Sequence, residues 1–244
     1  MKLRALGIYG GYPVSGHGTA CYLLEEGDVR ILLDIGSGAL MSLERYISLD
    51  AISAVLISHD HSDHTADAVV ASYGRLISKQ IGRTKEDLNF YGPENKVLKN
   101  QIERHNSAQY STLEEEKTYT FGPFEVTPIK MKHECLTYGY LIKSGEKTLF
   151  YSADTTFSEE LAKRVKGVDM LLLECSIYDK YGSGEKYGHL NGEEASEFLK
   201  IAKPKNAMLI HLPSFGDSTE LLEKVKESYK GKVSLIKSEE IYEI

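Results

Sequence analysis

The stretch His59-Asp60-His61-Ser62-Asp63-His64 places three imidazoles and two carboxylates within six residues. It directly follows the apolar run Ala54-Val55-Leu56-Ile57, which is typical of a buried strand. A strand that ends in a ligand-rich turn presents several side chains to one point from a rigid base, as a transition metal requires. The stretch therefore predicts a metal site at the end of a buried strand.

The spacing within this stretch divides the metal-binding side chains into two groups. His59 and His61 alternate along an extended chain, so they point to the same side. Asp63 and His64 follow the turn and reach a second position. Four coordinating groups from one turn suit two adjacent ions better than one. The alternative, a polar loop with solvated histidines, is disfavoured because the chain has only 8 histidines.

Length and composition predict one globular domain over residues 1–244, with 41% hydrophobic and 27% charged residues. No Pro/Gly/Ser-rich linker divides the sequence. The three cysteines, Cys21, Cys135 and Cys175, are an odd number at no metal-finger spacing. We therefore expect reduced thiols in or near the core and no disulfide framework.

Charge and hydropathy restrict the expected partners and location. The longest apolar runs, such as Met170-Leu171-Leu172-Leu173, are too short to cross a bilayer, and no signal-peptide pattern is recognised. We expect a cytoplasmic protein with no membrane partner. The net charge of −7 disfavours a stable complex with long nucleic acid, because such binding depends on many Lys and Arg contacts. A small-molecule or short nucleotide substrate is expected instead.

Hydrophobic periodicity predicts strands interleaved with helices. Ser158, Asn191 and Asp217 are the expected N-caps of three of the helices. Such a pattern predicts a sandwich of two sheets covered outside by helices. The predicted strands are 2–8, 20–25, 29–34, 53–58, 88–91, 117–121, 124–132, 137–143, 147–151, 168–174, 206–211 and 232–237, and the predicted helices are 39–47, 65–80, 94–105, 158–166, 191–202 and 217–229.

Further candidate ligands follow other predicted strands. His133, Asp154 and His211 each come directly after an apolar run. This is the expected arrangement if one edge of the sandwich gathers the site. Any one of them alone is more often an ordinary polar residue, but together with the opening motif they are predicted to be metal ligands.

Together these residues resemble the motif set of the metallo-β-lactamase superfamily, over about residues 3–240. The resemblance implies an α/β fold, the four-layer αββα sandwich, with the site at one edge. The run Leu32-Leu33-Asp34-Ile35-Gly36 resembles the family's second strand and its following turn, which support the site without supplying a ligand. Carried over to this chain, the resemblance implies a first metal on His59, His61 and His133, a second on Asp63, His64 and His211, and a bridge from Asp154.

The implied cofactor is a pair of divalent metal ions, with zinc expected first and manganese or iron as alternatives. Two cations about 3.5 to 4 Å apart share a water, lower its pKa towards neutrality, and so provide a bridging hydroxide. Asp63 would also act catalytically, by orienting that water or accepting its proton.

Two other segments resemble the ribonuclease Z and phosphodiesterase branch. They are Glu174-Cys175-Ser176 and Gly188-His189-Leu190-Asn191. The resemblance assigns Glu174 and His189 to a catalytic pair that protonates the leaving oxygen or stabilises charge on phosphate. A strand-end ion-pair role for Glu174, with His189 as a loop residue, is an equally open alternative. Only residues 134–153 separate His133 from Asp154, which leaves no room for the transfer-RNA-binding arm.

The resulting hypothesis is a short-form phosphodiesterase that acts on cyclic or short nucleotides. Two alternatives stay open: a lactonase or thioesterase with the same metals, and a non-catalytic metal-binding protein. A homodimer is expected because this branch often forms one. The glycine-rich loop at residues 10–19 is expected near the site edge, and the polar, aromatic segment at residues 178–187 is typical of a mobile lid or a partner-facing loop.

Overall fold

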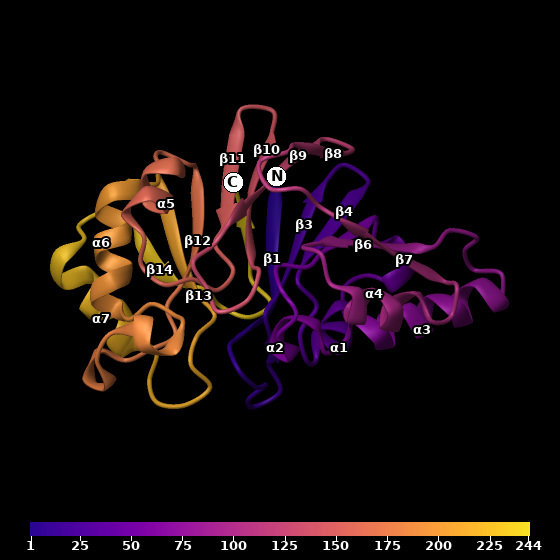
Figure 1. The fold of residues 1–244 in the computed structure, drawn as a ribbon, viewed down its shortest axis with the longest axis horizontal. Coiled ribbons are helices and arrows are strands. Elements are labelled where there is room, and N and C mark those ends of the chain that lie inside the picture. The colour runs from indigo at the N-terminus through magenta and orange to yellow at the C-terminus, as the bar shows by residue number, and fades with distance from the viewer. The chain divides into compact units, whose positions relative to one another are not determined.

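A computed structural model describes residues 1–244 as two compact units, each built on one sheet with helices (Figure 1). The first unit comprises Met1–Glu114, Phe121–Pro123 and Ser238–Glu243. The second comprises Glu115–Thr120, Phe124–Lys237 and Ile244. Both units mix parallel and antiparallel strands, in agreement with the α/β class expected from the sequence.

The first sheet has the order β15-β1-β3-β4-β5-β6-β7, with β2 paired to β1. Strands β4 to β7 run parallel to one another, so their carboxyl ends meet at one edge of the sheet. The strands are β1 (Lys2–Tyr9), β2 (Gly18–Thr19), β3 (Cys21–Glu26), β4 (Val29–Leu33), β5 (Ala54–Leu56), β6 (Leu88–Gly92), β7 (Ala108–Thr112) and β15 (Ile241–Glu243). The helices are α1 (Ala39–Leu43), α2 (Ser62–Thr65), α3 (Ala68–Gln80) and α4 (Lys96–Glu103), with a short 3-10 turn η1 (Leu49–Ala51).

The first core lies between this sheet and its helices. Leu32 of β4, Val55 of β5 and Phe90 of β6 are fully buried and share one hydrophobic cluster with Ala68 and Ala71 of α3. Figure 1 shows α3 and α4 alongside β6 and β7. Parallel pairing of β4 with β5 places their carboxyl ends side by side, and the ligand-rich stretch begins there.

The second sheet has the order β14-β13-β12-β11-β10-β9-β8. Strands β11 to β14 are parallel, so their carboxyl ends also meet at one edge. The strands are β8 (Tyr119–Phe121), β9 (Phe124–Lys130), β10 (Tyr138–Ser144), β11 (Lys147–Tyr151), β12 (Met170–Glu174), β13 (Asn206–Ile210) and β14 (Val233–Leu235). The helices are α5 (Glu159–Arg164), α6 (Gly192–Ala202) and α7 (Thr219–Ser228), with 3-10 turns η2 (Asp179–Tyr181) and η3 (Gly184–Tyr187).

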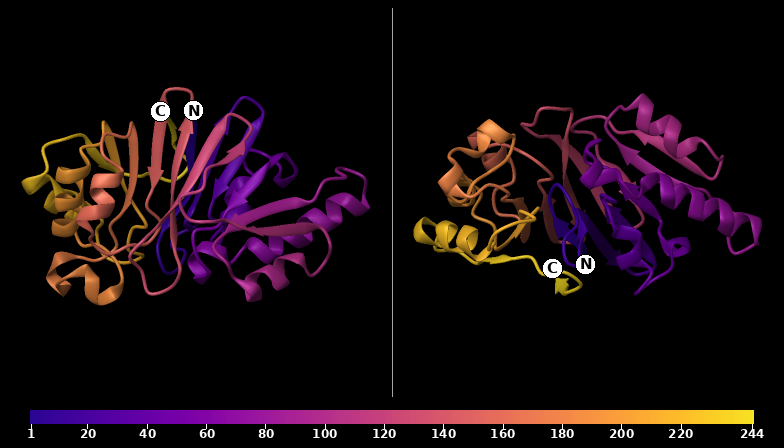
Figure 2. Two further views of the ribbon diagram at one scale, coloured as in Figure 1. Left: turned by 45° about the horizontal axis from the view of Figure 1, so that its top comes forward. Right: turned by 90° about the horizontal axis from the view of Figure 1, so that it is seen from below.

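The helices of the second unit cover the parallel half of its sheet. Figures 1 and 2 show α5, α6 and α7 together beside β12 to β14. Phe198 and Leu199 of α6 are fully buried, as are Leu171 to Leu173 of β12. The antiparallel hairpin of β9 and β10 extends the sheet on the other side and carries no helix of its own.

Most predicted elements are confirmed, and the differences have local causes. The expected helix over 65–80 is two helices, because the chain breaks at Ala66–Asp67 between α2 and α3. Ser158 and Asn191 cap their helices as predicted, and Asn191 forms a capping box with Glu194. The prediction of Asp217 as an N-cap is wrong, since Ser218 occupies that position.

Three strands were not predicted: β2, β7 and β15. Strand β7 reads Ala-Gln-Tyr-Ser-Thr, so its polar residues hide the alternation by which Ala108 and Tyr110 are buried. Strands β2 and β15 are only 2 and 3 residues long and depend on pairing with β1. Such short segments carry no periodicity, and their tertiary partners determine their conformation.

The cysteines and the helices agree with the expectations from composition. Cys21, Cys135 and Cys175 are all free thiols, and Cys21 and Cys175 are buried. Burial raises the pKa of both buried thiols well above the usual value, which keeps them protonated and unreactive. None of the helices combines the length and the apolar character that a membrane-spanning helix needs.

Candidate metal centre

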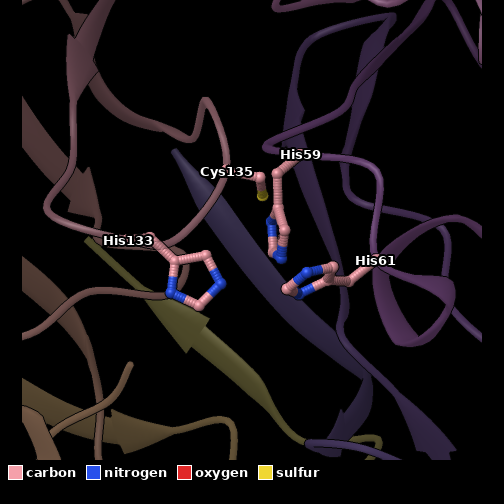
Figure 3. Close-up of side chains that lie close together, drawn as sticks. All are labelled: His59, His61, His133 and Cys135. Atoms are coloured by element: carbon pink, nitrogen blue, oxygen red, sulfur yellow. The ribbon is translucent and has the colours of Figure 1, made fainter. Parts of the chain in front are cut away.

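The ligand-rich stretch of the first unit forms a compact turn at the carboxyl end of β5. His61 is the N-cap of α2, and the backbone N–H of His64 donates to its carbonyl at 3.0 Å. The backbone N–H of Ile35 donates to the carbonyl of His64 at 2.9 Å, which ties the turn to the chain that leaves β4. The rings of His59 and His61 lie edge to face with centroids 4.5 Å apart (Figure 3).

A buried carboxylate and a buried hydroxyl orient two histidines of this turn. The Asp34 carboxylate, at the end of β4, accepts hydrogen bonds from the Ser58 backbone N–H and the Ser58 hydroxyl, each at 2.7 Å. Asp34 Oδ2 also lies 2.7 Å from Nδ1 of His64. Because the Ser58 proton is given to Asp34, the Ser58 oxygen accepts from Nδ1 of His59, 2.9 Å away.

This network fixes both rings in the same tautomer. His59 and His64 each carry their proton on Nδ1, and Nε2 is the nitrogen that presents a lone pair. Asp34, Ser58, His59 and His64 are all fully buried, so the network is protected from water. A hydrogen bond at one imidazole nitrogen is the usual way in which proteins orient a histidine for a metal at the other.

Asp63 is held by the glycine-rich loop. The backbone N–H of Gly11 donates to Asp63 Oδ2 at 2.6 Å. Gly11 has a positive φ of 75°, a backbone conformation that is strained for residues with a side chain. Asp63 Oδ2 also lies 3.7 Å from Nε2 of His64, so these two predicted ligands of the second metal lie together.

The second unit gathers its candidate residues at the carboxyl ends of β9, β11, β12 and β13. Asp154 is 1% exposed, and its Oδ1 lies 3.4 Å from Nε2 of His211. Its Oδ2 lies 3.9 Å from Nδ1 of His189. The ligating atoms of Asp154, His189 and His211 all lie within 4.8 Å of one another, which makes this group able to hold a metal ion.

A second carboxylate and hydroxyl repeat the arrangement of the first unit. Glu174 Oε2 accepts from the Ser176 hydroxyl at 2.8 Å, and Ser176 Oγ lies 2.8 Å from Nδ1 of His211. Nδ1 of His189 lies 2.9 Å from Glu174 Oε1. By the same argument as for Ser58, His211 donates through Nδ1 to Ser176, and Nε2 is left to face Asp154.

The two units thus contain the same kind of network. In each, a fully buried carboxylate at a strand end accepts from a serine hydroxyl and from one histidine, and the serine orients a second histidine. Asp34 and Ser58 do this at β4 and β5, whereas Glu174 and Ser176 do it at β12. Sequence reasoning missed both serines as orienting groups, although each is adjacent to or close to a quoted motif residue.

His133 is oriented by a backbone carbonyl. Its Nδ1 lies 2.9 Å from the carbonyl oxygen of Gly188. Gly188 has a positive φ of 79°, and a Cβ built on it would lie 3.2 Å from the His133 ring. The Cys135 thiol belongs to the same loop (Figure 3), and its sulfur lies within 4.8 Å of a His133 ring nitrogen.

The donor set fits a divalent transition metal. Four of the five histidines predicted as ligands are held at Nδ1 by a hydroxyl, a carboxylate or a carbonyl, and the remaining donors are carboxylates. Neutral imidazole and carboxylate are the donors that zinc and its neighbours prefer. The second unit therefore contains a His/Asp cluster that is able to bind metal, and the first unit contains oriented imidazoles of the same donor type.

Strain marks the strand ends that carry these residues. Asp34, Ala153 and His211 have φ values of 57°, 50° and 51°, a region that residues other than glycine rarely adopt. Asp34 and His211 directly follow β4 and β13, and Ala153 lies two residues after β11, beside Asp154. Such strain persists only where the surrounding structure enforces it, and it concentrates at functional sites.

Comparison with known protein families identifies the family to which this fold and these clusters belong. A family model described as "Beta-lactamase superfamily domain" matches residues 29–212, and the chain belongs to this superfamily. The metallo-β-lactamase fold predicted from the sequence is thereby confirmed.

Individual relatives of the chain include a metallo-hydrolase and ribonuclease Z proteins. "Probable metallo-hydrolase YhfI" of Bacillus subtilis (strain 168) is 31% identical over 249 residues, which is 100% of each chain. The crystal structure of the metallo-beta-lactamase fold protein YhfI from Bacillus subtilis superposes with a TM-score of 0.94 and 29% identity, over 99% of this chain and 98% of that one. Ribonuclease Z of Metallosphaera sedula is 24% identical over 280 residues, 94% of each chain. The resemblance to the ribonuclease Z branch is thereby confirmed.

Proposed function

We propose that this protein is a dinuclear metal-dependent phosphodiesterase that acts on cyclic or short nucleotides. The observation that carries the proposal is the fully buried Glu174 carboxylate, which holds His189 beside Asp154 and His211. A histidine held in this way, next to candidate metal ligands, suits protonation of a leaving oxygen.

The seven predicted ligands are proposed to form one dinuclear centre. Support comes from the oriented imidazoles and from the likeness to the YhfI crystal structure, which covers 99% of this chain. Zinc is the expected metal, with manganese or iron as alternatives. The proposed ligands are His59, His61 and His133 for the first ion, Asp63, His64 and His211 for the second, and Asp154 as the bridge.

Two bound cations would supply Lewis acidity and a water that loses its proton near neutral pH. Asp63, held by the Gly11 N–H, orients the attacking water and accepts its proton. An oxygen–phosphorus bond forms on the side of attack, and the bond from phosphorus to the leaving oxygen breaks. His189 donates a proton to that leaving oxygen, which balances the charge.

Glu174 makes His189 a credible proton donor. Its carboxylate accepts from the Thr155 backbone N–H at 2.9 Å as well as from His189 and Ser176, so it cannot rotate away. A carboxylate partner favours the protonated imidazole and fixes which nitrogen faces the substrate. A thioester hydrolase would not require this pair, because a thiolate leaves without a proton from a general acid.

The test joins metal analysis to a substrate panel on one sample. We expect about two divalent ions per chain, and turnover of bis-p-nitrophenyl phosphate and a 2′,3′-cyclic nucleotide. Turnover of a homoserine lactone or thioester without phosphodiester turnover would instead support the acyl hydrolase. Bound metal without turnover of any of these substrates would support the non-catalytic metal-binding alternative. Cytoplasmic location and a homodimer stay predictions.

A further inference from the structure

A pocket of about 350 Å³ lies beside His133, entirely within the second unit. Its wall nearest to the candidate ligands is formed by His133 and Gly188, where the Gly188 carbonyl holds the His133 ring. A side chain at Gly188 would crowd this wall, because its Cβ would lie 3.2 Å from the His133 ring. A substrate group that begins near His133 can therefore continue into this pocket.

The remaining walls combine an aromatic ring with charged and polar side chains, from Lys132, Glu134, Thr156, Glu185, Lys186 and Tyr187. The Tyr187 side chain is 43% exposed, and Lys186 Nζ lies 5.2 Å from its ring centroid. Lys132 Nζ and Glu185 Oε1 form an ion pair at 2.7 Å. The pocket thus offers one stacking surface together with both hydrogen-bond donors and acceptors.

This combination discriminates between classes of ligand. A second phosphate would have to approach the Glu185 carboxylate, and an alkyl chain would remove water from the ion pair without replacing its hydrogen bonds. A nucleobase satisfies both requirements, because it stacks on an aromatic ring and carries donors and acceptors along one edge. The volume is near the small end of ligand pockets, about 300 to 1,000 Å³, which suits one nucleoside rather than an oligonucleotide.

The stacking surface is held in place by helix α6. Ser183 Oγ donates to Glu194 Oε1 at 2.6 Å, and the Gly184 backbone N–H donates to Oε2 of the same carboxylate at 3.0 Å. These bonds anchor the 3-10 turn η3, which ends at Tyr187. An anchored platform binds with a smaller entropic cost than a free loop.

We infer that this pocket binds the nucleoside part of the substrate, with its base stacked on Tyr187 and its edge bound by Lys132 and Glu185. The inference rests on the proposed phosphodiesterase function and says where the nucleoside of its substrate binds. It extends the site from the reacting phosphate to the group that the phosphate carries.

The test compares two esters that share a leaving group. Thymidine 5′-(p-nitrophenyl) phosphate carries a nucleoside, whereas methyl p-nitrophenyl phosphate does not. In the metal-loaded protein, Tyr187→Ala is expected to lower the preference for the thymidine ester, measured as the ratio of the two kcat/KM values, about tenfold. Tyr187→Phe should retain the preference, because stacking needs only the ring.

A matched control is available on the neighbouring 3-10 turn. Tyr181 is 50% exposed and does not line the pocket, so Tyr181→Ala should leave the ratio unchanged. Calorimetric titration of the same metal-loaded proteins with adenosine 5′-monophosphate supplies a readout that needs no turnover. Tyr187→Ala is expected to weaken this binding about tenfold relative to both Tyr187→Phe and Tyr181→Ala.

The outcomes separate this inference from the proposed function. Turnover of both esters with an unchanged ratio and unchanged nucleotide binding in Tyr187→Ala would overturn the nucleoside pocket and leave the phosphodiesterase intact. Nucleotide binding that depends on Tyr187, with neither ester hydrolysed, would support the pocket and count against the phosphodiesterase.

Discussion

Nδ1 of His189 lies 2.9 Å from Oε1 of Glu174, at the carboxyl end of β12. The Glu174 side chain is 0% exposed and that of His189 is 20% exposed, so a buried anchor supports a partly accessible ring. This contact with Glu174 distinguishes His189, the proposed proton donor, from the residues that are proposed only as metal ligands. It also gives a way to remove one function while keeping the other.

Replacing His189 should slow the chemistry and leave the metals bound. We expect His189→Ala to lower kcat about 10²- to 10⁴-fold, the usual contribution of a general acid. Metal content should match the wild type, whereas His61→Ala should lose both metal and turnover. His105→Ala is the control, since His105 lies in the first unit, where its ring contacts Tyr73. Full activity of His189→Ala would remove this residue from the mechanism.

The hydroxyls of Ser58 and Ser176 should strengthen metal binding without contacting the metals themselves. Ser176→Ala and Ser58→Ala each remove the group that orients Nδ1 of a proposed ligand, His211 or His59. Loss of such an orienting group costs about 10- to 100-fold in metal affinity. Competition with a chelator measures this directly. Ser196→Ala is the matched control, because Ser196 is 1% exposed and its hydroxyl makes no hydrogen bond.

Cobalt substitution gives the serine variants a second readout. We expect the visible absorption of the cobalt-loaded protein to shift in Ser176→Ala, because His211 can adopt another tautomer. Thr in place of Ser176 keeps the hydroxyl and should restore part of the affinity. Equal chelator resistance in Ser176→Ala and Ser196→Ala would show that the hydroxyl does not orient His211.

Gly36 provides a steric test of the ligand turn. A Cβ at Gly36 would lie 2.0 Å from the Asp63 carbonyl oxygen and 2.3 Å from Thr19 Oγ1, so the turn must move to accept it. We expect Gly36→Ala to weaken metal binding and to lower the free energy of unfolding by about 1 to 3 kcal/mol or more, as overpacking does. Urea unfolding and metal titration measure the two effects.

Gly74→Ala is the matched control for Gly36→Ala. Gly74 lies within α3, and the nearest contact of its Cβ would be the flexible Leu49 side chain at 3.1 Å. Alanine in a helix interior gains about 0.5 to 1 kcal/mol over glycine, so this variant should keep wild-type metal binding and stability or better. Wild-type metal affinity in Gly36→Ala would mean that the turn is not under this constraint.

The strand ends explain why much of the site could be predicted. His133, Asp154 and His211 each follow an apolar run. Parallel strands bring their carboxyl ends to one edge of a sheet, so a residue's place after its strand in the sequence predicts which residues lie close together within a unit. The same logic holds for the turn after β5. In both cases the informative signal is local: an apolar run followed by a ligand type.

The hydroxyl networks could not be predicted in the same way. Ser58 and Ser176 are common residues in a common context, and only the pairing of β4 with β5 brings Ser58 to Asp34. Likewise, β7 is polar and was missed because its burial comes from its place beside β6. Signals that depend on a tertiary neighbour are absent from the periodicity of a single segment.

Asp169 gives a pH dependence of stability that is independent of the metals. Its hydrogen bond with Lys205, at 2.7 Å, and those from Thr148 lower its pKa from 3.8 to about 2, although burial opposes the shift. A lowered pKa in the folded state stabilises the protein above about pH 4, and this contribution is lost as the pH falls towards 2.

The expected contribution of Asp169 is at most about 2 kcal/mol, from 1.4 kcal/mol per pKa unit and the exposure of Lys205. Urea unfolding at pH 6 and pH 2.5 of wild type and Asp169→Asn measures it. The stability difference between the two proteins should be larger at the higher pH. A difference that is the same at both pH values would contradict the assignment.

The central proposal is that seven side chains hold one pair of divalent ions. Anomalous diffraction from crystals of the zinc-loaded protein, recorded on both sides of the zinc absorption edge, tests it most directly. We expect two peaks about 3.5 to 4 Å apart, one contacted by His59, His61 and His133, the other by Asp63, His64 and His211, and Asp154 in contact with both. A single peak away from these residues, or no peak in a well-ordered crystal, would contradict the account.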